Sequence, residues 1–437
     1  MRIAFATVGC RLNQFETDAL RGKARAAAHE VVPFEADADV YVINTCTITA
    51  DADADSRQLA RRAVRRNPSA LVVVTGCYAQ GAPEAAAAIP GVDLVIGNRE
   101  KSGLLAEIDR VRKNGGPHVL VSDIAAASRM DGDEYGPGID PDRTRAFLKV
   151  QDGCNYGCSF CVVPAVRGPN RSQEPEHVLA AIRRLHAAGF PEVVLTGIHL
   201  GTYGRDLRPR TTLGALCDAI GALAEAPRVR LSSLDPHEVT PELIRLFADA
   251  PRFCRHLHLP LQSGNEGVLR RMRRGHTAAD YRALVERLAV EVPMMAVTGD
   301  VIVGFPGEDA DAFRSTYELI EGLPIAGLHV FSYSRRPGTD AAEYPDQVSR
   351  AVKIERSRAL RSLAVRKAQS FRQRMVGRTL ETVVLRQDSD AGVLEGLTDN
   401  YLRVWFPGDP GFRGTVVRVR VEAATGRGVV GSLAPRR

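Results

Sequence analysis

Three cysteines spaced CxxxCxxC constrain this chain more than any other feature of its sequence. The segment reads Cys154-Asn-Tyr-Gly-Cys158-Ser-Phe-Cys161. Thiolates this close together on one loop can wrap a single metal centre. A structural zinc ion takes four ligands, and no histidine stands nearby in the sequence to complete the set. A 4Fe-4S cluster on three thiolates keeps one iron open for a substrate or cofactor, so it fits best. A zinc site and three ordinary thiols are the alternatives.

A second triplet, Cys10, Cys46 and Cys77, is dispersed along the chain, but its members share a local context. Each cysteine directly follows a short apolar run that predicts a β-strand. The strands expected are 2–8, 40–44, 71–75 and 94–96, with helices at 16–28, 54–66 and 81–88. Strands that alternate with helices form a parallel sheet, whose strand ends share one edge, where ligands bind. Gly9 and Gly76 permit close backbone approach there. We expect a second three-cysteine cluster, with three core cysteines as the alternative.

The rest of the chain divides by pattern into three parts. A linker rich in Gly, Pro and Asp is expected at 125–142. Six βα units follow between 145 and 328 and predict a partial or full barrel. Short strands separated by Gly, Asp and Pro fill the last part and predict a small antiparallel β-barrel. The barrel strands expected are 146–150, 192–196, 229–233, 256–260, 297–303 and 327–333. The later strands expected are 382–385, 392–397, 401–406 and 415–421. Cys217 and Cys254 are expected in the core.

Positive charge is unevenly distributed along the chain. The net charge is +6, yet ten Lys or Arg stand against one acidic residue between Arg350 and Arg378. Residues 372–437 carry 11 Arg against 7 acidic residues, and Arg270-Arg-Met-Arg-Arg274 forms another short cluster. Such charge neutralises phosphates without reading a sequence. We expect RNA to be bound here, although a run of charge is also typical of a solvated helix face. Tyr401, Trp405 and Phe406 could stack on bases, and core packing is the alternative for Trp405.

Targeting signals are not apparent in the sequence. The N-terminus runs straight into a strand-like pattern, and no apolar stretch reaches the roughly 18–20 residues that a membrane helix needs. We therefore expect a cytoplasmic protein with no membrane partner. Disulfides are not expected in that compartment, which strengthens the metal interpretation of the clustered cysteines.

With both cysteine triplets in view, the chain resembles the radical S-adenosylmethionine (SAM) methylthiotransferases along nearly its whole length. Residues 1–112 resemble their N-terminal α/β domain, 143–369 the radical SAM barrel, and 372–435 an RNA-binding TRAM β-barrel. Within the family, the chain is most similar to the branch that acts on threonylcarbamoyladenosine in tRNA. Segments 9–17, 149–154, 195–204 and 232–236 carry that similarity.

The resemblance implies two 4Fe-4S clusters and SAM as cofactors. The cluster on Cys154, Cys158 and Cys161 would bind SAM and cleave it reductively, and the resulting radical would take a hydrogen from the adenine C2 position. The cluster on Cys10, Cys46 and Cys77 would hold the sulfur that is methylated and transferred. The remaining SAM contacts implied are Phe160, Gly197, Ser233, Gln262 and Asp300, with the segment from Asp300 to Glu308 supporting the adenine. His199 is a candidate on the substrate side.

The partners implied are the tRNA anticodon loop, where the target base at position 37 is already unpaired, and an electron donor such as flavodoxin or ferredoxin. No DNA partner is expected. Three other functions stay open from the sequence: methylthiolation of isopentenyladenosine in tRNA, methylthiolation of a ribosomal-protein aspartate, and a non-catalytic iron–sulfur protein that binds RNA.

Overall fold

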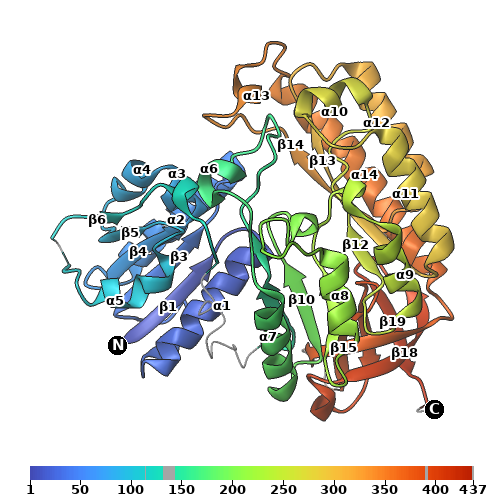
Figure 1. The fold of residues 1–437 in the computed structure, drawn as a ribbon, viewed down its shortest axis with the longest axis horizontal. Coiled ribbons are helices and arrows are strands. Elements are labelled where there is room, and N and C mark those ends of the chain that lie inside the picture. Colours follow the sequence, from blue (N-terminus) through green and yellow to red (C-terminus); the bar gives the residue numbers. More distant parts are fainter. Residues whose placement is uncertain (114, 131–142, 389–391, 436–437) are drawn as a thin grey trace.

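The computed structural model describes residues 1–113, 115–130, 143–388 and 392–435. Figure 1 shows an α/β lobe at the N-terminus, a larger central body, and a small β-barrel packed beneath that body. This arrangement confirms the α/β fold class expected from the sequence. Most of the predicted linker, residues 131–142, lies outside the described residues.

The N-terminal lobe is built on a six-stranded sheet in the order β2-β1-β3-β4-β5-β6, and all of its strand pairs are parallel. Every residue of β3 is buried, because helices cover both faces of a parallel sheet. The strands are β1 (Arg2–Thr7), β2 (Glu30–Val32), β3 (Val40–Thr45), β4 (Leu71–Gly76), β5 (Leu94–Ile96) and β6 (His118–Leu120). The helices are α1 (Arg11–Ala26), α2 (Ala50–Arg66), α3 (Cys77–Gly81), α4 (Pro83–Ala87) and α5 (Leu104–Ile108).

The central body is a partial barrel of six parallel strands. Two three-stranded sheets, β11-β10-β7 and β12-β13-β14, are joined by isolated bridges from Val229 to Phe253 and from Ser233 to His258. Within the described residues β7 and β14 do not pair, so the barrel stays open between them. The strands are β7 (Ala146–Lys149), β10 (Glu192–Thr196), β11 (Arg228–Leu231), β12 (His256–His258), β13 (Ala296–Val303) and β14 (Gly327–Ser332), with a short ribbon of β8 (Gln151–Asp152) and β9 (Arg171–Ser172).

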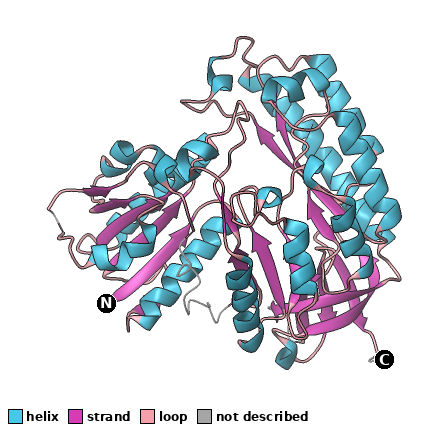
Figure 2. Cartoon of the chain, in the orientation of Figure 1, coloured by secondary structure: helices cyan, strands magenta, loops and turns pink. Residues whose placement is uncertain are grey.

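Helices lie on the outer side of the barrel strands (Figure 2). Their starts follow capping rules: Thr277 and Asp280 form a capping box at α11, and the Ser349 side chain caps α14. The helices are α6 (Val163–Arg167), α7 (Pro175–Ala187), α8 (Leu213–Gly221), α9 (Pro241–Asp249), α10 (Glu266–Met272), α11 (Ala278–Glu291), α12 (Ala310–Gly322), α13 (Asp340–Glu343) and α14 (Arg350–Arg374). None of the helices among the described residues is both long and apolar enough to cross a membrane.

The C-terminal β-barrel is closed, in the order β15-β16-β17-β19-β18. The strands are β15 (Thr379–Gln387), β16 (Val393–Thr398), β17 (Arg403–Pro407), β18 (Val416–Ala424) and β19 (Val429–Leu433). Tyr401 was expected in a strand, but it lies in the β16–β17 turn with a φ of 67°. Phe406 is 1% exposed in the barrel core, so the prediction that it stacks on RNA bases is wrong. The ring of Tyr401 instead stacks on His256 of the central barrel.

Candidate functional site

The CxxxCxxC loop runs from the β8–β9 ribbon to α6. The Cys154 amide donates to the Gly168 carbonyl at 3.0 Å, which folds the loop back on itself. Gly153, with a φ of 72°, must be glycine, because a Cβ there would lie 1.9 Å from the Pro169 carbonyl oxygen. Burial is the main cause that raises the pKa of Cys161 to about 12, and the neighbouring Cys158 and Cys154 add to the rise. Cys154 and Cys158 thus lie near enough to Cys161 for their charges to act on its thiol, and a shared metal centre on the three cysteines stays a prediction.

Two basic side chains reach the sulfurs of this loop. Arg274 donates to Cys158 Sγ at 3.4 Å and is ion-paired with Asp235. His199 Nδ1 lies 3.3 Å from Cys154 Sγ, and its Nε2 lies 2.9 Å from Glu238. Burial lowers the pKa of His199, but hydrogen bonds to Cys154 and Glu238 outweigh burial and raise that pKa to about 9. His199 was expected on the substrate side, and here it contacts the cysteine loop.

The dispersed triplet also converges, at one edge of the N-terminal sheet. Cys10 is the N-cap of α1, Cys46 follows β3, and Cys77 opens α3 directly after β4. Gly9, with a φ of 100°, passes so close that a Cβ would lie 2.7 Å from the Cys46 Cβ. Burial raises the pKa of Cys46 to about 12, and the charges of Cys77 and Cys10 contribute to the rise. The parallel sheet thus brings together cysteines that are far apart in the sequence.

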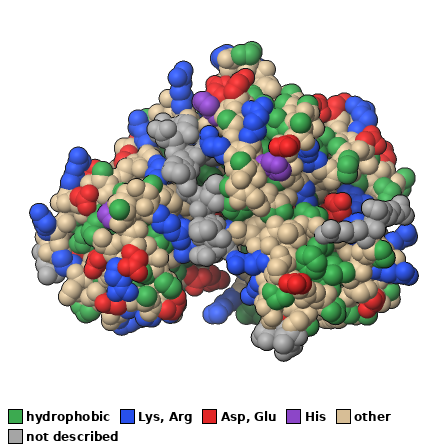
Figure 3. All heavy atoms as spheres, turned by 90° about the horizontal axis from the view of Figure 1, so that it is seen from below, with side chains coloured by type: hydrophobic (Ala, Val, Ile, Leu, Met, Phe, Trp, Pro, Cys, Tyr) green, Lys and Arg blue, Asp and Glu red, His purple; other side chains and the backbone are tan. Residues whose placement is uncertain are grey.

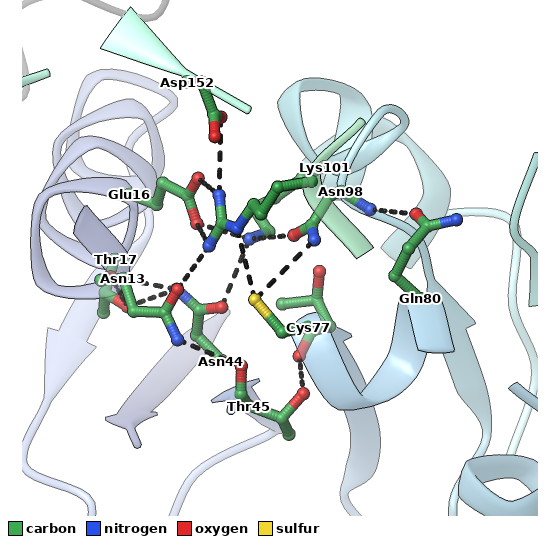
Figure 4. A network of polar contacts seen from close by, with 12 residues as sticks. Asn13, Glu16, Thr17, Asn44, Thr45, Cys77, Gln80, Asn98, Lys101 and Asp152 are labelled. Carbon is green, nitrogen blue, oxygen red and sulfur yellow. Dashed lines mark hydrogen bonds and ion pairs between the residues drawn. The ribbon is translucent and has the colours of Figure 1, made fainter. Parts of the chain in front are cut away.

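A buried polar network lies against Cys77 (Figure 4). Arg167, from α6, donates through Nε to Cys77 Sγ at 3.2 Å and pairs with Glu16 and Asp152. Lys101 also pairs with Glu16, at 2.5 Å. Burial opposes the ionisation of Glu16, but the charges of Arg167 and Lys101 outweigh it and hold the pKa of Glu16 well below its usual range. Because α6 begins two residues after Cys161, this helix links the two cysteine triplets.

The sequence-based prediction missed the charged residues around both triplets. Arg274 was assigned to an RNA-facing cluster, yet its guanidinium is buried between Asp235 and Cys158. The pairing of Arg167 with Glu16 carried no signal, since the two residues are separated by 151 positions in the chain. A buried charge is recognisable only once its partner is in place.

The spacing of the thiols bears on which metal group they fit. A tetrahedral zinc ion would hold its sulfur ligands within about 4 Å of one another, because each Zn–S bond is about 2.3 Å long. In the described part of the chain, the groups of three or more ligand atoms within 4.8 Å are His199/Asp235/Glu238 and His258/Asp300/His329. Neither group contains a cysteine. Among the described residues, neither triplet therefore has the close ligand spacing of a zinc site, and a 4Fe-4S cluster on three thiolates is compatible with both.

A cavity of about 190 Å³ lies between Ile48 and Thr49, in the segment that follows Cys46, and the ends of β13 and β14. Phe160, Gln262 and Asp300, three of the predicted SAM contacts, line it beside Cys161. Gln262 Oε1 and the Tyr333 hydroxyl are buried there with no hydrogen-bond partner among the described residues. Unpartnered buried polar atoms call for a hydrogen-bonding partner, so the cavity is a candidate site for a polar cofactor.

Two other predicted SAM contacts lie elsewhere. Gly197 and Ser233 follow the ends of β10 and β11 and are not among the residues that line this cavity. Gly197 packs against Gln151, since a Cβ would lie 2.7 Å from the Gln151 Oε1. The Glu308 carboxylate accepts from the Gly304 amide at 2.8 Å and pairs with Arg356, so it fixes the turn after β13. A SAM contact by Gly197 or Ser233 remains a prediction.

Two family models match the chain. One, described as the uncharacterized protein family UPF0004, matches residues 2–97, and the other, the Radical SAM superfamily, matches residues 148–320. Among solved structures, the radical SAM methyltransferase TsrM from Kitasatospora setae is similar, with a TM-score of 0.56 and 17% identity over 78% of this chain and 76% of that one. That likeness concerns the fold alone.

Curated relatives match nearly end to end. Threonylcarbamoyladenosine tRNA methylthiotransferase MtaB of Bacillus subtilis is 40% identical over 422 residues, which cover 96% of this chain and 93% of the relative. The Aquifex aeolicus protein of the same name is 40% identical over 92% of this chain and 96% of its own. The tRNA-2-methylthio-N(6)-dimethylallyladenosine synthase of Moorella thermoacetica is 32% identical over 96% of this chain and 95% of its own. The chain therefore belongs to the radical SAM methylthiotransferases, as its motifs indicated.

Proposed function

We propose that this protein converts N6-threonylcarbamoyladenosine at position 37 of tRNA, next to the anticodon, into its 2-methylthio derivative. The observation that carries the proposal is the 40% identity, over nearly the full length, to relatives named for that substrate. The two cysteine triplets, linked through α6, support it, because methylthiolation needs both a site that activates the base and a site that delivers sulfur.

Each group has residues that would hold it. Cys154, Cys158 and Cys161 would bind one 4Fe-4S cluster, and Cys10, Cys46 and Cys77 the other. SAM would contact Phe160, Gln262 and Asp300 in the cavity, with Gly197 and Ser233 at neighbouring strand ends. When bound, these groups supply reductive cleavage of SAM, removal of the adenine C2 hydrogen, and the methylated sulfur that replaces it.

The protein's own groups orient and tune these cofactors. Arg274 and His199 are placed to donate to the sulfurs of Cys158 and Cys154, and hydrogen bonds to cluster sulfurs shift the reduction potential. Glu238, 2.9 Å from His199 Nε2, fixes the ring so that Nδ1 faces Cys154. Arg167 stands in the same relation to Cys77. The burial of these groups keeps water away from a reactive centre.

Charge on α14 supports a tRNA substrate. Arg350, Arg358 and Arg361 are exposed on this helix, where they can neutralise phosphates. Arg356 is an exception, since it is buried in a pair with Glu308. Figure 3 shows further Lys and Arg side chains beside the hollow between the N-terminal lobe and the rest of the molecule. We also propose that the protein works in the cytoplasm and takes electrons from a donor such as flavodoxin or ferredoxin.

Nucleoside mass spectrometry of tRNA tests the proposed substrate. A strain that lacks this gene should lose 2-methylthio-threonylcarbamoyladenosine and accumulate the unmodified nucleoside. The wild-type gene should restore the product, and Cys154→Ala should not. Persistence of the product in the deletion strain would refute the assignment. Loss of 2-methylthio-isopentenyladenosine instead would move the protein to the other tRNA branch.

Iron analysis tests the two-cluster arrangement. Cys10→Ala and Cys154→Ala should each halve the iron and labile sulfide of the anaerobically purified protein, because each removes one ligand of a different triplet. Cys217→Ala is the matched control: this cysteine is buried in α8, away from both triplets, and its loss should leave iron unchanged. Wild-type iron content in both cluster variants would contradict the arrangement.

A further inference from the structure

The faces of β13 and β14 that look into the barrel carry two cross-strand rungs of different chemistry. Ile302 pairs with Phe331, and Asp300 pairs with His329. Side chains two apart on a strand share a face, so the two rungs lie one above the other. The Ile302–Phe331 rung lines the cofactor cavity together with Asp300. Asp300 therefore lies at the border between the cofactor cavity, which is apolar at the Ile302–Phe331 rung, and a polar region on the other side of the Asp300–His329 rung.

Charged and hydrogen-bonding groups surround that polar space. His258 Nε2 and His329 Nδ1 lie 3.0 and 3.1 Å from the same oxygen of Asp300. The Tyr401 ring stacks on His256, whose Nε2 lies 3.2 Å from the Thr298 hydroxyl, and His258 Nδ1 lies 3.0 Å from that same hydroxyl. Arg11 donates to the Tyr401 hydroxyl at 2.7 Å. We use the name polar end for Arg11, His258, Asp300, His329 and Tyr401.

The polar end is open to solvent, and its cation, Arg11, makes few hydrogen bonds among the described residues. The side chain of His329 is 68% exposed, although it faces into the barrel, because the barrel is not closed beside β14. Among the described residues, the hydrogen bonding of Arg11 is confined to the Tyr401 hydroxyl. Arg11 directly follows Cys10, so this arginine connects the dispersed cysteine triplet to the C-terminal barrel through Tyr401. Its remaining N–H groups are available to an anion that enters from the open side.

We propose that the polar end receives the N6 substituent of the substrate base, and that Arg11 pairs with the carboxylate of a threonylcarbamoyl group. This inference rests on the proposed function. The Asp300 carboxylate already contacts the two histidines, so the Arg11 guanidinium is the group left to pair with an incoming anion. An apolar isopentenyl group would desolvate the Arg11 guanidinium and offer it no anion to pair with, which is costly. Arg11 would thus be a specificity residue that selects the carboxylate-bearing substrate.

Binding of two RNAs tests the inference. Fluorescence anisotropy, with the cluster-loaded protein kept unreduced, would compare anticodon stem-loops that carry threonylcarbamoyladenosine or its neutral primary amide at position 37. The wild type should bind the carboxylate RNA about tenfold more tightly, since a charge-assisted pair contributes about that much. In Arg11→Gln the two affinities should be equal, and Arg11→Lys should keep part of the preference. Arg61→Gln, which removes an exposed charge from α2, should keep all of it.

The outcomes separate the inference from the function beneath it. Equal binding of the two RNAs by the wild type would overturn the role of Arg11, and this comparison needs no variant to fold. A tenfold preference that survives in Arg11→Gln would overturn it as well. Failure of the reduced wild type to methylthiolate the carboxylate RNA would instead overturn the proposed function.

Discussion

Arg167 carries a positive charge at a position where the residue is only 1% exposed. Its guanidinium meets two carboxylates, Glu16 and Asp152, and one thiol, Cys77. Burying ions costs free energy. Removing only one partner of a buried ion pair is strongly destabilising, because the other charge then stays buried without compensation. Arg167 therefore ties the position of Cys77 to the helix that follows the CxxxCxxC loop.

Replacing Arg167 by methionine should lower the free energy of unfolding by about 3–5 kcal/mol, because Glu16 and Asp152 would keep their charge without that partner. Glu16→Gln should cost less in the Arg167→Met chain than in the wild type, since Arg167→Met has already removed the Arg167–Glu16 pair. Urea denaturation of both single variants and the double variant measures the coupling. Strictly additive effects would contradict a direct pair.

At this scale the sequence predicted the cysteines better than their surroundings. Spacing alone pointed to Cys154, Cys158 and Cys161, and position after a strand pointed to Cys10, Cys46 and Cys77. The side chains that reach the sulfurs, such as Arg274 and His199, could not be assigned in this way. Their roles depend on partners, such as Asp235 and Glu238, that only the fold brings near.

Among the elements, the β16–β17 turn makes contacts that attach the C-terminal barrel to the central barrel. It fits under the central barrel, where Arg230 of β11 donates to the carbonyls of Asp399 and Thr398 at 2.8 and 3.1 Å. Arg230 is itself held by a buried pair with Glu192 of β10, at 3.0 Å. The turn presents Tyr401 in a left-handed conformation that side chains seldom adopt. The C-terminal barrel is thereby fixed to the barrel strands as well as to α14.

Arg230→Met should release this turn while β15–β19 stay folded. Hydrogen exchange at residues 398–402 should become at least about tenfold faster, because the turn loses charged donors to its carbonyls. Arg245→Met is the control, since Arg245 forms an exposed pair with Glu242 on α9 and is expected to change nothing there. Unchanged exchange in Arg230→Met would show that the turn is held by other contacts.

Predicted elements matched the structure where the apolar pattern was long enough to read. All six central barrel strands were expected within a few residues of their observed positions. β2 and β6 were missed, although β5 is equally short and was expected: β2 and β6 begin with Glu30 and His118, whereas β5 is an unbroken apolar run. β19 was missed as well, and Tyr401 was placed in a strand because an aromatic residue favours one.

At the scale of the whole molecule, the N-terminal lobe is held to the central barrel beside Cys46. Arg336, in the loop after β14, pairs with Asp53 of α2 at 2.7 Å and donates to Thr47 at 2.8 Å. The Ser334 hydroxyl accepts from the Ala50 amide at 3.1 Å. Sequence patterns could not predict these contacts, because they join residues more than 280 positions apart.

Arg336→Met should loosen the lobe and uncouple the two halves of the proposed reaction. SAM cleavage should continue, since the CxxxCxxC loop is untouched, but sulfur delivery should suffer. The measured ratio of 5′-deoxyadenosine to methylthiolated product should rise several-fold. Arg335→Met is the matched control. Among the described residues, the Arg335 side chain forms an exposed ion pair with Glu343, at 3.4 Å, and such surface pairs contribute little. Equal ratios in the two variants would exclude a coupling role for Arg336.

The contact between Arg11 and Tyr401 also sets an order of events during synthesis. These residues are 390 positions apart, so a ribosome has released the first long before it makes the second. A nascent chain that extends through β14 already holds all six cysteines, but the hydroxyl that fixes Arg11 does not yet exist. On the proposed assignment, the clusters could begin to load before translation ends, whereas the Arg11–Tyr401 contact forms only after the C-terminal barrel has been made. A chain that ends prematurely after β14 would hold all six cysteines but lack Tyr401, and with it the contact that fixes Arg11.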